Sequence, residues 1–404
     1  MDDRLLELRV RNFRSLRDIT LPLGPVNVMV GPNGAGKTNV LEVFRFLADI
    51  VRTDLEPALE RRGGLESLLF RGDRTDDFLQ IDLSGTWDAQ AVAGHYTLKL
   101  TGPTLAREER FVFDFADGTR RLTRVEGASA SMETLAPDGS VREIHAPPPF
   151  RLDERPLGEA ALGIRPLSSG LSTLSRLAPV MGGAQVRSLA DFLDSFKIVQ
   201  IDVEAAAKPS RVRGTMFSAI DSDASNLAVS LFSLAATEAW EFLVADAVAV
   251  LPQLEDIDFE HPSGPAREVV VVLRERGLRD PTQLADASYG TIRLLSLLAL
   301  LYDPRPPALT CIEEIDHGLH PQALELLVDR IREQSRRTQF LIATHSPAFA
   351  NRLTPDELIV CERSADGSSI IPAISNEKVK EIVAASEGLP LGELWFSGAL
   401  GGDL

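Results

Sequence analysis

Cysteine is scarce in this sequence. Only two occur among 404 residues, Cys311 and Cys361, and each lies inside a short apolar run. This scarcity excludes a disulfide framework and a four-cysteine zinc site, and it fits a reducing compartment. We therefore expect both cysteines to lie in the core.

Long apolar runs are absent as well. No stretch reaches the roughly 18–20 apolar residues that a membrane-spanning helix needs. The segment from Met1 to Arg4 also lacks the basic start and apolar stretch of a signal peptide. We expect a cytoplasmic protein with no membrane partner.

Positive charge is in short supply. Lys and Arg number 42 against 59 Asp and Glu, which gives a formal net charge of −17. Such a balance excludes a surface that is basic all over and binds nucleic acid by releasing counterions. Any DNA site must therefore be local. Three small basic clusters could touch phosphate, at 61–62, 119–124 and 211–213.

The rest of the composition is that of a globular protein, with 44% apolar and 25% charged residues. At roughly 100–200 residues per domain, the length predicts two or three domains. We expect residues 1–150 to begin with a strand, loop and helix unit and to continue as antiparallel strands. The strand patterns lie at 5–10, 25–30, 78–83, 95–100 and 110–115, and the helix pattern at 39–51.

The middle of the chain changes character. Residues 151–284 read as an inserted, mainly helical lobe, with the clearest helix patterns at 186–196 and 224–250 and a short strand at 269–273. Residues 285–404 then return to alternating helices and strands, with strands at 308–312 and 340–343. The two ends of the chain are expected to share one sheet in an α/β fold.

A glycine-rich loop lies between the strand at 25–30 and the helix at 39–51. It fits the pattern G-x-x-x-x-G-K-[ST] in the place where that pattern has a physical role. Backbone amides of the loop can wrap phosphates, Lys37 adds a point charge, and the Thr38 hydroxyl can bind Mg²⁺. The predicted nucleotide-binding residues are Gly31, Pro32, Asn33, Gly34, Ala35, Gly36, Lys37, Thr38 and Asn39.

Charged and polar side chains follow two later strands. The strand at 308–312 ends in Glu313 and Glu314, an arrangement that delivers carboxylates beside Mg²⁺ and the γ-phosphate. We assign Glu313 to the metal and Glu314 to the attacking water. The apolar run at 339–343 leads to His345, which can reach the γ-phosphate from a neighbouring strand. A zinc site at His317 and His320 is disfavoured because no other soft ligand is nearby.

One more turn could bind an anion. Ser288 and Gly290 precede a helix pattern at 292–301. Taken alone, this turn is a helix cap. The order of all these elements, however, resembles that of the ABC-type ATPases of the SMC, RecF and OLD group: Walker A, signature, Walker B, D-loop and histidine switch.

Further segments carry the same resemblance. Residues 8–16 resemble the "NFRS" start of RecF-like and SMC-like heads, 313–321 resemble the Walker B and D-loop of OLD-like ATPases, and 389–398 resemble their tail. The likeness is weak over about 125–283. Tyr289, Ala287 and Glu313 depart from the usual signature and Walker B residues, and Gln80 is a weak candidate for the glutamine that senses Mg²⁺.

The resemblance implies a P-loop NTPase with an ABC-type head, an antiparallel β subdomain and an inserted, mainly helical lobe. In such proteins ATP lies between two heads. Ser288 and Gly290 of one chain would then meet the γ-phosphate held by Lys37 of another, in a homodimer that forms with ATP and Mg²⁺. Hydrolysis would make the protein a switch in DNA repair or antiphage defence.

The resemblance also names partners and leaves an alternative. DNA and a separately encoded effector, such as a nuclease, are candidate partners. The alternative function is a nucleotide-gated scaffold with negligible turnover. An OLD-type nuclease is disfavoured because only about sixty residues follow His345, too few for a Toprim domain. No coiled-coil arm separates Lys37 from Ser288, which disfavours cohesin-like action.

Overall fold

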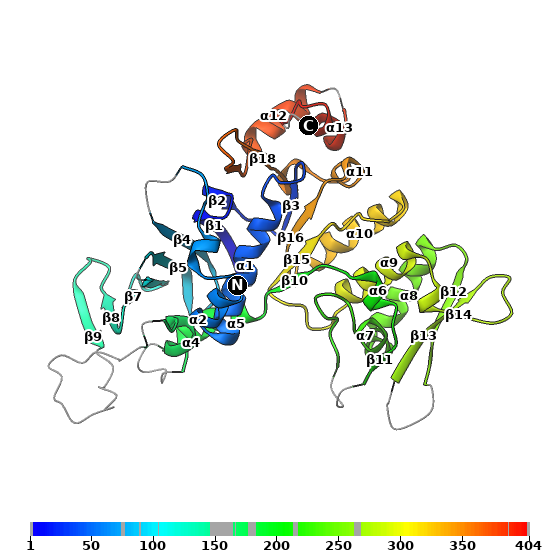
Figure 1. The fold of residues 1–404 in the computed structure, drawn as a ribbon, viewed down its shortest axis with the longest axis horizontal. Coiled ribbons are helices and arrows are strands. Elements are labelled where there is room, and N and C mark those ends of the chain that lie inside the picture. Colours follow the sequence, from blue (N-terminus) through cyan, green and yellow to red (C-terminus); the bar gives the residue numbers. More distant parts are fainter. Residues whose placement is uncertain are drawn as a thin grey trace.

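A parallel sheet lies at the centre of the computed structural model (Figure 1). The structure describes residues 3–73, 77–88, 90–103, 105–145, 165, 167–176, 183–212, 217–261, 268–386 and 388–401. Within these residues the sheet has five strands in the order β10-β15-β16-β3-β17. Their bounds are β3 Val26–Val30, β10 Lys197–Val199, β15 Leu309–Glu313, β16 Gln339–Thr344 and β17 Leu358–Val360.

Both faces of this sheet are buried, which explains why its strands are continuous apolar runs. Successive side chains of a strand point to opposite faces. Cys311 and Leu341 belong to one core cluster together with the apolar face of α1 (Lys37–Thr53). Ile312 and Ile342 belong to a second cluster together with α9 (Tyr289–Leu301) and α10 (Pro321–Gln334). The expectation that both chain ends share one sheet is confirmed.

An antiparallel sheet packs over α1 on the first side. Its order is β2-β1-β4-β5-β6-β7-β8-β9. Alternate residues of its strands, such as Leu79, Ile81 and Leu83, lie in the same core cluster as α1. The strands are β1 Arg4–Phe13, β2 Leu16–Pro22, β4 Phe78–Thr86, β5 Ala91–Thr101, β6 Ala106–Phe115, β7 Arg120–Glu126, β8 Ser129–Leu135 and β9 Val141–His145. Two short helices, α2 Leu55–Glu60 and α3 Leu65–Leu68, follow α1.

The middle segment serves both sides of the central sheet. Its first helices, α4 (Gly170–Leu174) and α5 (Gly183–Asp194), belong to the α1 side, where Phe192 and Phe196 lie in the same cluster as Phe44. The chain then passes through β10 into the lobe at the right of Figure 1. The proposed domain limits at 150 and 284 stay a prediction, and residue 150 itself lies outside the described residues.

The lobe combines helices with a small antiparallel sheet. Its elements are α6 Val203–Ala206, β11 Ser210–Arg211, α7 Leu227–Leu234, α8 Ala239–Val250, β12 Leu254–Glu260, β13 Glu268–Glu275, β14 Thr282–Gln283 and the 3₁₀ turn Leu284–Asp286. The helix predicted at 224–250 is in fact two, since α7 and α8 meet at 120°. The break is a short turn in which Thr237 bonds back to the Leu234 carbonyl with its amide and its hydroxyl.

The remaining elements are α11 Pro347–Ala350, a 3₁₀ turn at Pro355–Glu357, the hairpin strands β18 Glu362–Arg363 and β19 Ser369–Ile370, α12 Asn376–Ala385 and α13 Leu391–Phe396. The helices α11, α12 and α13 belong to the second side of the sheet, whereas the hairpin lies beside β2 on the first side. Both cysteines are buried and unpaired, as expected. Among the described helices, none alone has the length and apolar composition to cross a membrane, although the bent pair α7 and α8 together meets that test.

A fully buried ion pair joins the antiparallel sheet to the helices around α1. Arg107 and Glu109 on β6 lie 3.4 Å apart with both side chains inaccessible. Glu109 also accepts hydrogen bonds from the Tyr96 hydroxyl at 2.9 Å and the Gly170 amide at 2.6 Å, at the start of α4. Burial raises the pKa of Glu109, and the charge of Arg107 opposes that shift.

Removing the carboxylate should therefore be costly. Glu109→Ala leaves the Arg107 charge buried without its counter-ion, and we expect the free energy of unfolding to fall by about 3–5 kcal/mol. Asp114→Ala on the same strand breaks an exposed pair with Arg120 and should cost about 1 kcal/mol or less. Urea unfolding of both variants tests this. Equal losses would contradict a structural role for the buried pair.

Candidate nucleotide-binding site

The predicted phosphate loop runs from the end of β3 to the start of α1. Gly34 and Gly36 have φ of 83° and 104°, values that favour glycine. Space is also restricted, because a Cβ on Gly36 would lie 2.1 Å from the Ser369 Oγ and one on Gly31 would lie 2.3 Å from the Cys361 carbonyl oxygen. Cys361 and Ser369 thus leave room only for glycine at positions 31 and 36.

Lys37 folds back over this loop. Its ammonium donates to the carbonyl oxygens of Gly31 at 2.6 Å and Pro32 at 3.0 Å. Burial lowers the pKa of Lys37, while the negative charges of Asp316 and Glu314 oppose the shift. The positive charge of Lys37 is therefore held at the phosphate loop by two neutral backbone carbonyls.

Glu313 ends β15 with its side chain 8% exposed. Its Oε1 is among the buried side-chain atoms of the described residues that have no hydrogen-bond partner. Burial raises the pKa of Glu313, the charges of Glu314 and Glu42 add to this, and Arg45 opposes it. A cation at this carboxylate would remove the cost of the unpaired oxygen.

Glu314 follows in a left-handed conformation with φ of 51°. Its amide donates to the Ala343 carbonyl on the adjacent strand at 2.9 Å. This turn lets the side chains of both Glu313 and Glu314 line the same cavity. Positive φ at a residue other than glycine is costly and tends to be found at functional sites.

The carboxyl ends of β3, β15 and β16 converge on that cavity, whose volume is about 210 Å³. It brings together most of the residues predicted for the nucleotide, the metal and catalysis. The lining residues are Asn33, Gly34, Gly36, Lys37, Thr38, Asn39, Glu313, Glu314, Ala343, Thr344, His345 and Arg363. Gly31 and Pro32 contribute the carbonyls that hold Lys37, and Ala35 is buried beneath the loop.

Ser288 and Gly290 do not line this cavity. They lie at the start of α9, where the Ser288 hydroxyl accepts from the Thr291 amide at 3.1 Å and caps the helix. A Cβ on Gly290 would lie 2.8 Å from the Gly318 carbonyl oxygen. The predicted signature turn therefore packs against the predicted D-loop of its own chain.

Tyr289, which departs from the usual signature, reinforces that packing. Its hydroxyl lies 3.3 Å from His317 Nδ1, and its ring covers Gly318 so closely that a Cβ there would come within 2.5 Å. Buried Arg293, one turn further along α9, donates to the Glu314 carbonyl. The turn is thus connected to the backbone of the two carboxylates.

Three residues at the site were not predicted from the sequence. The guanidinium of Arg363 on β18 donates to the Gly34 carbonyl at 2.8 Å. Ser15 accepts from the Asn39 side chain at 2.7 Å and lies 2.6 Å from the Ser369 hydroxyl. Sequence spacing carries no signal for these contacts, because more than 300 residues separate Arg363 and Ser369 from the loop.

Other sequence candidates have local roles. Gln80 donates to Asp82 at 2.9 Å on the antiparallel sheet and does not line the cavity. His317 contacts Tyr289, and His320 caps the start of α10.

A second cavity of about 690 Å³ shares Asn39 and Arg363 with the first and contains Arg14, Phe70 and Arg71.

Strand order, phosphate loop and paired carboxylates together define a P-loop ATPase of the ABC type, in the group that includes the RecF, SMC and OLD proteins. The chain belongs to the family described as "AAA domain, putative AbiEii toxin, Type IV TA system", which matches residues 26–351.

Similar proteins match over short segments. An OLD nuclease from Thermus scotoductus is 53% identical over 55 residues, which cover 14% of this chain and 10% of that protein. The DNA replication and repair protein RecF of Acidothermus cellulolyticus is 38% identical over 101 residues, 23% of this chain and 27% of RecF. The chain thus aligns with about a quarter or less of these curated relatives.

The fold is similar over nearly the whole chain to a solved SMC head bound to the C-winged helix domain of ScpA. The TM-score is 0.52 at 15% sequence identity, covering 93% of this chain and 99% of that one. Likeness at this identity concerns the fold alone.

The restricted space around Gly36 leads to a test with a matched control. Gly36→Ala must accept both a positive φ and a collision with Ser369, whereas Gly64→Ala at φ 85° has nothing within 4 Å. We expect Gly64→Ala to cost about 1–3 kcal/mol of stability without changing nucleotide affinity, because Gly64 combines φ 85° with ψ 177°. Gly36→Ala should weaken binding of a fluorescent ATP analogue at least about tenfold. Equal affinities would contradict this description of the loop.

Proposed function

We propose that this protein binds and hydrolyses Mg·ATP and uses the nucleotide state to control association of two copies. The convergence of Lys37, Glu313, Glu314 and His345 on one cavity is the observation that carries the proposal. These residues lie at or after the carboxyl ends of the three neighbouring strands β3, β15 and β16, which is where open α/β sheets bind ligands.

Thr38 and Glu313 fit Mg²⁺. Both line the cavity, and the buried Glu313 Oε1 without a partner is the oxygen ligand that this hard cation prefers. When bound, the ion would supply positive charge to the phosphate oxygens.

The chain's own residues then have separable roles. Loop amides at the start of α1 bind the phosphates, and Lys37 moves from the Gly31 and Pro32 carbonyls to the terminal phosphates. Glu314 accepts a proton from the attacking water, and His345 donates a hydrogen bond to the γ-phosphate. The larger cavity beside the loop would take the nucleoside, with Phe70 as an apolar surface.

The site is incomplete within one chain. Ser288 and Gly290 are the remaining predicted phosphate ligands, and they lie outside the cavity at the start of α9. Tyr289 between them is 43% exposed, so the turn is accessible to a second copy. A γ-phosphate that bonds to both chains would couple ATP to dimerisation, and hydrolysis would remove those bonds.

The relatives' names, OLD nuclease and the DNA replication and repair protein RecF, support a role on DNA. We place the switch in DNA repair or antiphage defence, acting alone or with a separately encoded effector such as a nuclease.

Hydrolysis can be tested at Glu314. Glu314→Gln keeps the shape of the side chain but cannot accept a proton, so phosphate release should fall by about 10²–10⁴-fold with ATP affinity retained. Lys37→Ala should lose affinity as well. If the parent protein binds ATP but releases phosphate no faster than Glu314→Gln, the scaffold with negligible turnover is the better description.

Sharing of the site between chains can be tested by mixing two inactive variants. Lys37→Ala disables the phosphate loop, while Ser288→Asp keeps the helix cap but repels the γ-phosphate of the partner. In a head-to-head dimer, each mixed pair retains one intact site. We expect mixing to restore up to about a quarter of the parental activity. Activity that stays absent after mixing would place both residues in sites within one chain.

DNA binding can be tested at an exposed pair of arginines. Most predicted basic clusters are neutralised internally, since Arg62 pairs with Glu42 and Arg211 with Glu268, and Arg213 lies outside the described residues. Arg110 and Arg124 lie opposite each other on β6 and β7, both exposed.

Arg110→Glu/Arg124→Glu should therefore weaken a low-salt gel shift and reduce its salt dependence by about two contacts. No shift with the parent protein at low salt, with or without ATP, would exclude DNA from the account.

A further inference from the structure

We propose that the lobe carries a docking surface for a protein segment that combines apolar side chains with lysine or arginine. The surface has two adjoining parts that share Phe259: an aromatic corner formed by Phe232, Trp240, Phe259 and His261, and an acidic cavity on the strands β12 and β13. This surface is separate from the nucleotide site.

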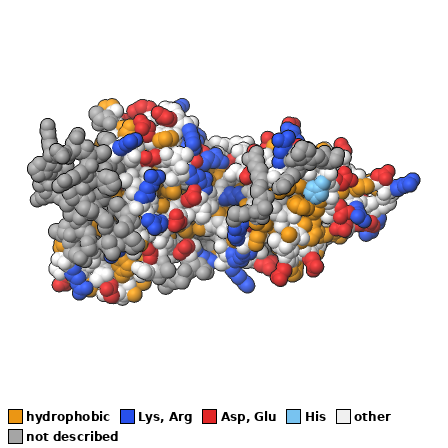
Figure 2. Space-filling view, turned by 90° about the horizontal axis from the view of Figure 1, so that it is seen from below, with side chains coloured by type: hydrophobic (Ala, Val, Ile, Leu, Met, Phe, Trp, Pro, Cys, Tyr) orange, Lys and Arg blue, Asp and Glu red, His pale blue; other side chains and the backbone are white. Residues whose placement is uncertain are grey.

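The aromatic corner is a set of interlocked rings. Phe232 contacts Phe259 and His261 edge-on, at centroid distances of 5.4 and 5.2 Å, and Trp240 lies 5.5 Å from Phe259. Phe232 remains 36% exposed. In Figure 2 hydrophobic side chains gather over the lobe around a histidine, with carboxylates beside them. Rings already fixed by one another lose little freedom on binding, and aromatic residues are typical anchors of interfaces.

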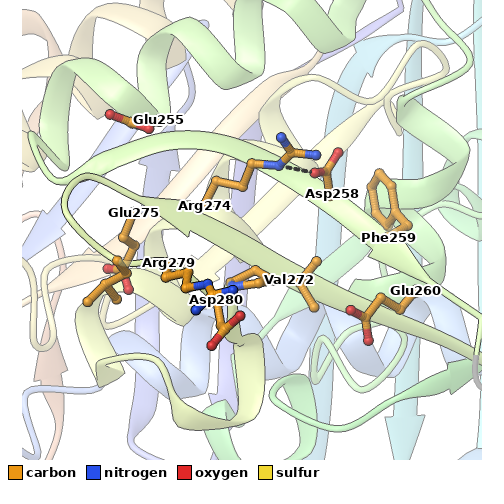
Figure 3. Close-up of a pocket in the computed structure, with 11 residues that line it drawn as sticks. Glu255, Asp258, Phe259, Glu260, Val272, Arg274, Glu275, Arg279 and Asp280 are labelled. Carbon is orange, nitrogen blue, oxygen red and sulfur yellow. Dashed lines mark hydrogen bonds and ion pairs between the residues drawn. The ribbon is translucent and has the colours of Figure 1, made fainter.

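The acidic cavity has a volume of about 610 Å³. It lies on the other face of β12 and β13, because Asp258 and Glu260 alternate with Phe259 along the strand, and it meets the corner at Phe259 on the outer strand β12. Figure 3 shows Phe259 beside Asp258, with Glu260 below them and Arg274 paired to Asp258. Five carboxylates and two arginines line the cavity, together with Leu278, which is 58% exposed. Glu260 has no ion pair with any described residue, so the cavity retains net negative charge.

The negative charge of the chain around this surface favours a positively charged partner. Residues 217–280, which include both strands of the cavity, contain twelve Asp and Glu and four Lys and Arg. Such a field repels nucleic acid and anionic membranes and attracts a cationic segment. The apolar corner adds a requirement for apolar side chains, which a purely basic tail would not meet. A partner protein with an amphipathic, basic segment satisfies both.

Tryptophan fluorescence gives a local readout. Trp87 and Trp395 are 2% and 1% exposed, whereas Trp240 is partly exposed in the corner. The probes are two synthetic amphipathic 14-residue peptides without tryptophan, one of Leu and Lys and one of Leu and Glu. Titration into the full chain without nucleotide separates this proposal from the proposed ATPase, because failure of one leaves the other intact.

We expect the Leu–Lys peptide to bind and shift the Trp240 emission to shorter wavelength, and the Leu–Glu peptide not to bind. Phe232→Ser should weaken binding at least about tenfold, whereas Phe396→Ser, at a phenylalanine that is 62% exposed on α13, should not. Glu260→Gln/Asp280→Asn should weaken binding about three- to tenfold and flatten its salt dependence. Glu56→Gln/Glu60→Gln on α2 should leave both unchanged.

Circular dichroism of each variant establishes that the fold is retained. Equal binding by the parent protein and Phe232→Ser would overturn the proposal, as would equal binding of the two peptides. Two other occupants would also overturn it. A nucleotide-free dimer that Phe232→Ser dissociates would make the occupant a second copy. Binding to phosphatidylcholine–phosphatidylglycerol vesicles that Phe232→Ser abolishes would make it a membrane.

Discussion

The structure depends on one constraint: parallel strands end at the same edge of their sheet. Because β16 lies between β15 and β3, the phosphate loop, the carboxylate pair and the histidine meet at one place although about 310 residues separate Gly34 from His345. Burial of both sheet faces fixes the register of these strands. A one-residue shift in the pairing of these strands would turn the side chains of each core toward the opposite face of the sheet. It would also displace the phosphate loop, the two carboxylates and the histidine.

The rest of the fold restricts how the site can move. The hairpin of β18 and β19 packs on the loop through Ser369 and Arg363, so the glycines there are required by sequence-distant neighbours. On the other side, α9 links the Ser288 turn to the Glu314 backbone through Arg293. The lobe that packs on α9 is therefore connected to the turn that would meet a second chain in the proposed dimer.

Much of this could be predicted from local pattern. The loop motif, the apolar strands ending in Glu313 and Glu314, and the alternating strands of the antiparallel sheet all carry short-range signals, and the structure has each of them. The break between α7 and α8 has a weak signal, since both halves are apolar and no glycine or proline separates them. Arg363 and Ser369 had no signal, because the fold alone brings them to the loop from more than 300 residues away. Ser15 lies in the segment 8–16 that carried the family resemblance, but no local pattern indicated its contact with Asn39. The lobe's sheet was only partly visible as the strand at 269–273.

In the proposed dimer, one copy's phosphate loop and another copy's Ser288 turn together hold one ATP. Sedimentation velocity of Glu314→Gln, which should trap the bound triphosphate, measures this most directly. We expect the mass of one chain without nucleotide and twice that mass with saturating Mg·ATP, and we expect ADP to restore the mass of one chain. A mass that stays at one chain while ATP is demonstrably bound would contradict it.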